Sequence, residues 1–118
     1  MNFKHIPLLN TETIDQIKSF STDNSMIVEL FTSFIDDSDI LVKKIHSHTK
    51  NLDEDLQSQV HTLKGVAGTI GASRLHEICK LFDNNLRQGN NDLNIELADK
   101  LEDCYSELKS YIINTYLH

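Results

Sequence analysis

The sequence contains very few of the residues that interrupt regular structure. Its 118 residues include one proline, Pro7, and four glycines. Proline and glycine punctuate chains built from many short strands, so their scarcity favours long helices. Only two cysteines are present, Cys79 and Cys104, and their spacing matches no metal or redox motif. Both fall on apolar helical stripes, so we expect reduced cysteines buried in the core.

An excess of positive charge and a long hydrophobic run are also lacking. The formal net charge is -7, which argues against electrostatic binding to nucleic acid or to an anionic membrane. No stretch approaches the roughly 20 apolar residues that cross a bilayer. Residues 1–10 lack the basic and apolar regions of a secretory signal. We therefore predict a cytoplasmic protein, monomeric, that binds another protein and neither nucleic acid nor membrane.

Apolar residues recur at spacings of three and four along most of the chain, which predicts five helices. A short helix is expected at about 12–20, and a long one begins near 21–23 and continues to about 49. The acidic run before residue 56 suits a helix N-terminus, so a third helix is expected from about 53 to Gly71. Ser73 is the expected cap of a fourth helix that ends at Gly89, and a fifth spans about 92–116.

The positions expected to be buried share these apolar faces. They are Ile14, Ile17 and Phe20; Met26, Ile27, Leu30, Phe31, Phe34, Ile35, Leu41 and Ile45; Leu56, Val60, Leu63, Val66, Ala67 and Ile70; Leu75, Ile78, Cys79, Phe82 and Leu86; and Leu97, Leu101, Cys104, Leu108 and Ile112. Short links between long amphipathic helices predict an all-α fold, an antiparallel up-and-down four-helix bundle with a short additional N-terminal helix. Residues 1–10 are expected to form an arm, and 11–118 are expected to form one domain. Asn10 or Thr11 is the expected N-cap of the first helix.

One histidine is expected to point away from the core. With about 100° per residue, the apolar residues of the third helix form one compact face and His61 lies opposite to it. Around it on the exposed side lie Lys64, Gly65, Gly68 and Ala72. A glycine inside a helix costs about 0.8 to 1 kcal/mol relative to alanine, so two of them need a reason other than helix stability. The residues predicted to contact a partner are Gly65, Gly68, Thr69 and Ala72.

The pair formed by His61 and Lys64 admits two interpretations. A neutral exposed imidazole is a competent nucleophile without a strong neighbouring base. Lys64, one turn away, could neutralise an incoming phosphoryl group. The plainer alternative is a solvated surface histidine beside a lysine. The two glycines count toward the first interpretation but leave both open.

The run from His61 to Ala72, HTLKGVAGTIGA, resembles the signature of histidine phosphotransfer domains. That signature is His-x-Leu-Lys-Gly, then small residues, then an apolar residue before Gly-Ala. The likeness continues through Leu75, Cys79, Phe82, Asp83, Arg87 and Gly89, over roughly residues 10–115. It implies phosphorylation of His61, with Lys64 as the cation that contacts the phosphoryl group and Gly65 as the residue that provides clearance.

Two positions depart from the commonest pattern of that family. Val66 stands where a small polar residue is frequent, and Asp83 stands where glutamate is usual. Neither is expected to touch the proposed chemistry. Val66 lies at the edge of the apolar face, where it would only deepen the packing.

The resemblance implies a phosphocarrier with no kinase activity of its own. A receiver domain's phospho-aspartate would donate to His61, which would donate to a second receiver. The catalytic acids and Mg²⁺ would come from the receiver, so no intrinsic cofactor is expected. Expected partners are response-regulator receiver domains and a hybrid sensor histidine kinase. The chain could equally be a domain of such a kinase or the phosphorylated domain of a chemotaxis-type kinase.

Two other classes of function remain as alternatives. An interaction bundle could dock a receiver or another protein through the same face without accepting phosphate. A metal-binding bundle would need Glu-x-x-His motifs on facing helices, and the sequence does not offer two. His46 with His48 and His76 with Cys79 are poor ligand pairs. The acidic residues Asp36, Asp37 and Asp39 are expected to form a solvated helix face.

Overall fold

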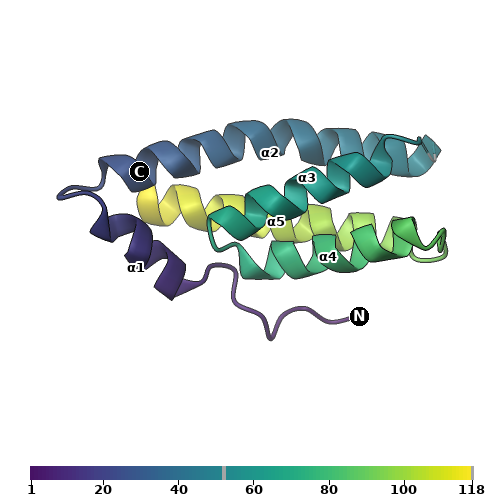
Figure 1. Ribbon diagram of the computed structural model, residues 1–118, viewed down its shortest axis with the longest axis horizontal. Coiled ribbons are helices and arrows are strands. Elements are labelled where there is room, and N and C mark those ends of the chain that lie inside the picture. The colour runs from purple at the N-terminus through teal and green to yellow at the C-terminus, as the bar shows by residue number, and fades with distance from the viewer. Residues whose placement is uncertain (52, 118) are drawn as a thin grey trace.

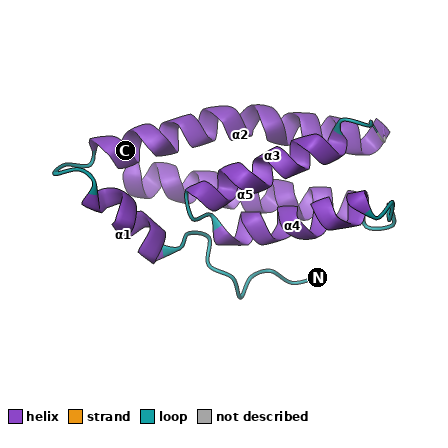
Figure 2. Ribbon diagram, in the orientation of Figure 1, coloured by secondary structure: helices purple, strands orange, loops and turns teal. Residues whose placement is uncertain are grey.

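The computed structural model describes residues 1–51 and 53–117, and within these ranges it contains five helices and no strand. They are α1 (Thr11–Ser19), α2 (Ser25–Asn51), α3 (Leu56–Thr69), α4 (Ser73–Arg87) and α5 (Asn94–Tyr116) (Figures 1 and 2). No helix in the described ranges combines the length and apolar character needed to span a membrane.

The four long helices form an antiparallel up-and-down bundle. Successive helices run in opposite directions, α3 packs against α2 and α4, and α5 packs against the same two helices (Figure 1). The short α1 lies against α2 at one end of the bundle. The predicted fold class is therefore confirmed, including the additional N-terminal helix.

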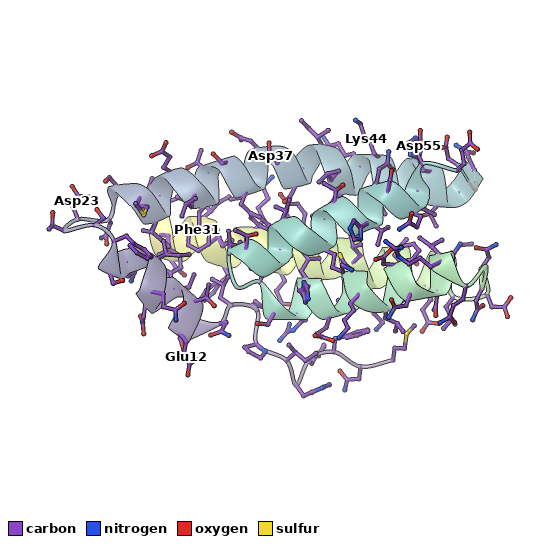
Figure 3. The ribbon with its side chains drawn as sticks, viewed as in Figure 1. Glu12, Asp23, Phe31, Asp37, Lys44 and Asp55 are labelled. Atoms are coloured by element: carbon purple, nitrogen blue, oxygen red, sulfur yellow. The ribbon has the colours of Figure 1, made fainter. Side chains whose placement is uncertain are left out.

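The core follows the predicted stripes most closely on α5, where all five expected residues are buried. On α2, Phe31 points into the bundle while Asp37 and Lys44 point away from it (Figure 3). Val42, which the prediction omitted, is buried, whereas Leu30 is 37% exposed. At about 100° per residue from Phe31, Val42 falls within about 20° of the centre of the stripe and Leu30 about 100° from it.

Two further expected core positions, Met26 and Phe20, are wrong for related reasons. Met26 is 37% exposed and lies still further from the centre of the α2 stripe than Leu30. Phe20 is 76% exposed because, as the C-cap of α1 with helical backbone angles, it lies about 120° around the helix from buried Ile14. Ser38, a polar residue, is instead fully buried within the α2 stripe.

The helix boundaries confirm one predicted cap, correct another and move one predicted helix start. Asn10 caps α1, since its side chain accepts from the backbone N–H of Glu12 at 2.9 Å. α3 begins at Leu56, after the acidic run, because Asp53 accepts the Leu56 N–H within a preceding turn. Ser73 is the first residue of α4 and makes no capping hydrogen bond.

Gly71 shapes the link between α3 and α4 in the way that only glycine can. Its φ of 76° lies in the left-handed region, and an added Cβ would lie 2.8 Å from Cβ of Thr13 on α1. The link therefore both reverses the chain and lets α1 approach closely. It also ends the helical progression of α3 two residues before Gly71.

The N-terminal arm is held against α4 by Arg74. The guanidinium donates to the carbonyl of Ile6 at 2.8 Å and to that of Lys4 at 3.2 Å, while the Arg74 backbone N–H donates to Pro7 at 3.1 Å. Phe3, Leu8 and Leu9 also pack on the core. Ile6 contributes its carbonyl. The boundary between arm and domain remains a prediction.

Both cysteines are buried and make no disulfide. Burial raises the pKa of the Cys79 thiol and raises that of Cys104 to about 12. Both side chains therefore stay protonated at neutral pH and act as small apolar core residues.

Candidate functional site

His61 lies in the middle of α3 on the face turned away from the core. Its side chain is 52% exposed, whereas Val60, Leu63 and Ala67 on the opposite face are fully buried. The predicted orientation of His61 is therefore confirmed.

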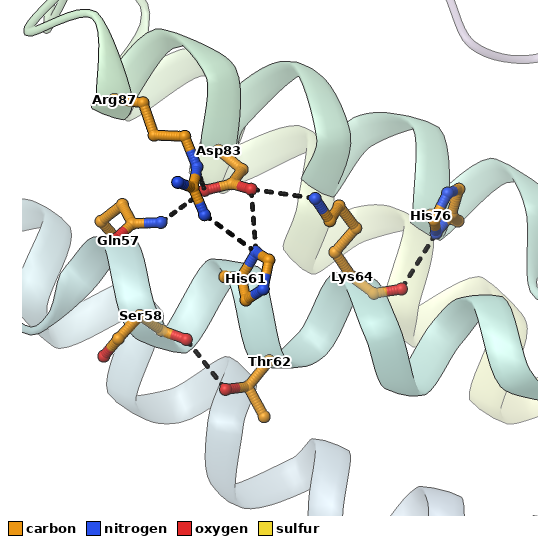
Figure 4. Close-up of polar contacts among 8 residues, drawn as sticks. All are labelled: Gln57, Ser58, His61, Thr62, Lys64, His76, Asp83 and Arg87. Atoms are coloured by element: carbon orange, nitrogen blue, oxygen red, sulfur yellow. Dashed lines mark hydrogen bonds and ion pairs between the residues drawn. The ribbon is translucent and has the colours of Figure 1, made fainter.

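A buried carboxylate from the neighbouring helix, Asp83 on α4, organises the residues around His61 (Figure 4). One oxygen, Oδ2, lies 3.1 Å from Nδ1 of His61 and 3.0 Å from Nζ of Lys64. The other, Oδ1, accepts from Nε2 of Gln57 at 2.7 Å and from Nε of Arg87 at 3.1 Å. We call these five residues the Asp83 cluster.

The Asp83 carboxylate is charged despite its position. Its side chain is only 1% exposed, and burial alone would raise the pKa of the carboxyl. The hydrogen bonds from Gln57, His61, Lys64 and Arg87 outweigh that effect and hold the pKa well below its usual range. Asp83 is therefore a fixed negative charge beside the His61 ring.

The contacts of the ring leave one nitrogen available. Both interactions of His61 within the cluster are made by Nδ1, and the other ring nitrogen is turned away from Asp83 (Figure 4). A carboxylate can only accept, so the Asp83 contact requires a hydrogen on Nδ1. In that tautomer Nε2 carries the lone pair, on a ring that is half exposed to solvent.

The expectation that Asp83 does not touch the chemistry at His61 is wrong. The sequence held a signal for its role, because Asp83 follows Cys79 by four residues and so lies on the apolar stripe of α4. A carboxylate at a buried position needs hydrogen-bonding partners. Gln57, one turn before His61, was missed because a glutamine on an exposed helix face carries no distinctive signal.

The two glycines of α3 have different surroundings. A Cβ added at Gly65 would meet nothing within 4 Å, so the predicted open space beside His61 exists there. A Cβ at Gly68 would lie 3.2 Å from Nδ1 of His76, which bonds the carbonyl of Lys64 at 2.9 Å. A Cβ at Gly68 would therefore press against a histidine of this chain, although Gly68 itself is exposed, and its contact with a partner stays a prediction.

Of the other two predicted contact residues, Thr69 is exposed and Ala72 is fully buried. The placement of Ala72 on the exposed face is wrong because α3 ends at Thr69 and Gly71 turns the chain. Thr69 lines a shallow groove of about 180 Å³ between α2 and α3. The groove also contains Leu30, Phe34 and Val66, so Val66 borders open space instead of only deepening the core.

Several other histidine and aspartate side chains noted in the sequence form ion pairs and hydrogen bonds. Nδ1 of His46 contacts Glu102 at 2.9 Å, and Nδ1 of His48 contacts Gln59 at 2.7 Å. Asp39, expected on a solvated face, instead bonds Tyr105 and Lys109 of α5. Within residues 1–51 and 53–117, no group of three or more His, Cys, Asp or Glu side chains is arranged to hold a metal ion.

The fold and the site define a class of protein: an all-α bundle with a polar site that is centred on a histidine of one helix and completed by the next helix. The family model described as "Hpt domain" matches residues 29–111, and the chain belongs to that family. Hpt domains act in histidine phosphotransfer within phosphorelays, and they are phosphocarriers and not autonomous kinases.

The fold is shared with a solved structure of a rice protein described as a histidine-containing phosphotransfer protein. The two chains are 19% identical, with a TM-score of 0.74, over 87% of this chain and 76% of the rice chain. At that identity the likeness shows the common fold. No curated protein matches the sequence.

Proposed function

We propose that this chain carries a phosphoryl group on Nε2 of His61, receives it from the phospho-aspartate of one receiver domain and passes it to a second. The observation that carries the proposal is the half-exposed His61 ring whose Nδ1 lies 3.1 Å from buried Asp83. That contact favours the tautomer with a lone pair on the outward nitrogen. Among the residues that the structure describes, the ring nitrogen held by contacts is Nδ1, and the transfer does not use that nitrogen.

The transfer step follows from this arrangement. The Nε2 lone pair attacks phosphorus, the bond from phosphorus to the aspartyl oxygen breaks, and the electron pair leaves with the receiver's carboxylate. The hydrogen stays on Nδ1, and the positive charge that develops on the ring is offset by the Asp83 carboxylate. Return transfer to a receiver reverses the same bonds.

Lys64 is the proposed cation for the phosphoryl group. Its ammonium has three N–H donors, and the contact with Oδ2 of Asp83 at 3.0 Å uses one of them. The remaining two are available to an anion on the ring. Because Lys64 and His61 share Oδ2 of Asp83, the ammonium is held close to the imidazole.

The proposed docking face lies beside His61 along α3 and α2. Gly65 provides clearance, Thr69 is exposed, and the groove lined by Leu30 and Val66 offers apolar surface. A receiver domain seated there would bring its acidic site to the imidazole. The proposed partners are receiver domains and a hybrid sensor kinase, and the catalytic acids and Mg²⁺ are assigned to the receiver.

Incubation with a receiver that carries phosphate-labelled aspartate tests the proposal. The expected product is label on this chain that is labile in acid and stable in base, as a phosphohistidine is. The label should be absent from a His61→Gln variant. Binding of the receiver without any transfer of label would overturn the proposal in favour of an interaction module.

A further inference from the structure

Two groups of opposite character meet at the same nitrogen of His61. Oδ2 of Asp83 lies 3.1 Å from Nδ1, and Nη2 of Arg87 lies 3.2 Å from it (Figure 4). A carboxylate only accepts hydrogen bonds and a guanidinium only donates them. Nδ1 of a neutral ring has either a hydrogen or a lone pair. The two contacts therefore belong to different tautomers of His61.

The two tautomers differ in what they can do at the exposed side of the ring. With the hydrogen on Nδ1, donated to Asp83, Nε2 has a lone pair and can attack phosphorus. With Nδ1 accepting from Arg87, the hydrogen lies on Nε2. The remaining lone pair then lies on Nδ1, whose approach is occupied by Asp83 and Arg87.

The two competitors also differ in mobility. The Asp83 side chain is 1% exposed and is held by Gln57 and Lys64 as well, so its position is fixed. The Arg87 side chain is 54% exposed, and its second contact is to Asp83, four residues earlier on α4. Arg87 can therefore swing into solvent by giving up only its contacts with His61 and Asp83, each made from a side chain that is half exposed. Asp83 has no such freedom.

From this we infer that Arg87 is a positioning residue that restrains the acceptor, because its hydrogen bond to Nδ1 favours the tautomer with the hydrogen on Nε2. Withdrawal of Arg87 leaves Asp83 as the only partner of Nδ1 and returns the lone pair to Nε2. The acidic site of a docked receiver, itself anionic, is the kind of partner that would draw the guanidinium away. This inference rests on the proposed function, since it concerns the reactivity of the same histidine.

The tautomer can be measured directly, without any phosphate. Long-range proton–nitrogen correlation spectra of nitrogen-15-labelled protein, recorded where the ring is neutral, distinguish a hydrogen on Nδ1 from one on Nε2. Arg87→Met, which keeps the length of the side chain and removes its donors, should shift His61 toward the hydrogen on Nδ1. Asp83→Asn should shift it the opposite way. Lys80→Met, which removes an exposed charge elsewhere on α4, should leave it unchanged.

Reactivity provides the second readout. Phosphoramidate is a small phosphoryl donor that needs no docking, and Arg87→Met should raise the rate at which it phosphorylates His61. We expect a rise of about two- to fivefold, the change in population that one partly exposed hydrogen bond controls. Arg87→Lys, which keeps a cation but lacks the fork of donors, should lie between the two.

The outcomes separate this inference from the proposed function. An unchanged tautomer ratio in Arg87→Met overturns the inference, and so does a slower reaction with phosphoramidate, which would make Arg87 a contact of the phosphoryl group. Neither result affects phosphorylation of His61 itself. A shifted ratio in a protein that accepts no phosphate from any donor would support the inference and overturn the proposed function.

Discussion

Two histidines of this bundle each contact a carboxylate through Nδ1, but the two carboxylates differ in their surroundings. Nδ1 of His46 on α2 contacts the carboxylate of Glu102 on α5 at 2.9 Å, and Nδ1 of His61 contacts that of Asp83 at 3.1 Å. Both rings are about half exposed. Glu102, however, is 46% exposed, whereas Asp83 is 1% exposed.

This difference in burial shows what an imidazole–carboxylate pair needs before it can act as a site. Glu102 is solvated, so it can rotate away and its pairing with His46 is screened by water. Asp83 is fixed by four donors, including the ammonium of Lys64, and it stays charged inside the protein. Only the second arrangement holds a ring and a neighbouring cation in one place.

The largest expected effect is loss of the acceptor. His61→Gln should abolish phosphorylation and leave helicity and melting temperature nearly unchanged, because the side chain is half exposed. His46→Gln, the matched substitution in the solvated pair, should leave phosphorylation at the wild-type level. Label from a phosphorylated receiver on His5, His46, His48, His76 or His118 of the His61→Gln variant would refute the assignment of a single acceptor.

Clearance is the second difference between the two histidines, since Gly65 lies one turn from His61. Gly65→Gln should keep the fold, or stabilise α3 by several tenths of a kcal/mol, and should block receiver docking. Titration calorimetry with a receiver, together with urea unfolding, measures both effects. Ser106→Gln on the exposed face of α5 is the control. If stability rose while affinity and transfer were unchanged, Gly65 would not border an interface.

The next largest expected effect is that of removing the Lys64 ammonium. Lys64→Ala should slow the maximal rate of phosphoryl transfer about ten- to thirtyfold, which corresponds to about 1 to 2 kcal/mol of transition-state stabilisation. Docking should weaken by no more than about 1 kcal/mol. Lys109→Ala, which removes the ammonium paired with Asp39, should change neither value. Rapid-quench kinetics, with the Kd measured separately, distinguishes an effect on transfer from an effect on docking. An unchanged maximal rate would make Lys64 a docking residue at most.

The contribution of each carboxylate to the free energy of unfolding can be compared by removing its charge. Asp83→Asn should lower the free energy of unfolding by about 1 to 3 kcal/mol at pH 7, because buried donors lose a charged acceptor. Glu102→Gln should cost about 0 to 1 kcal/mol. Urea unfolding of both variants measures the difference. Equal effects would mean that burial of Asp83 adds nothing to its interactions.

The pH dependence of the Asp83 effect has a defined sign. The folded-state pKa of Asp83 is lowered, so its contribution is fully present above the unfolded carboxyl pKa of about 3.9. It is lost as the pH falls below that value toward the folded-state pKa. The stability difference between wild type and Asp83→Asn should therefore be constant from pH 7 to about pH 5 and shrink below about pH 4.

The smallest expected effect concerns Gly68. Gly68→Ala should change stability by less than about 0.5 kcal/mol, because the gain in helix propensity is offset by a contact at 3.2 Å with His76. In a His76→Ala background the same change should stabilise by about 0.5 to 1 kcal/mol. A double-mutant cycle in urea measures the coupling. Additive effects would show that His76 does not determine the glycine at position 68.

Helical periodicity predicted the bundle well where the stripes are long and uninterrupted. α5 is the clearest case, since all its predicted core residues are buried. The prediction failed at Ala72, which lies beyond the end of α3, because the 100° rule no longer applies once Gly71 turns the chain. It failed at Phe20 because that residue lies about 120° around α1 from buried Ile14. It also failed at Ser38, a polar residue at a buried position on α2.

For the site, the sequence by itself determined which face of α3 carries His61, with Lys64 on the next turn and Gly65 beside it. These are relations within one helix, and a helix fixes them through its own geometry. Only the tertiary structure decided that Asp83 and Arg87 of α4 converge on Nδ1 and that the His76 ring lies close to Gly68. Such contacts depend on the separation and register of two packed helices, which result from side-chain packing along their whole length and from the turn at Gly71.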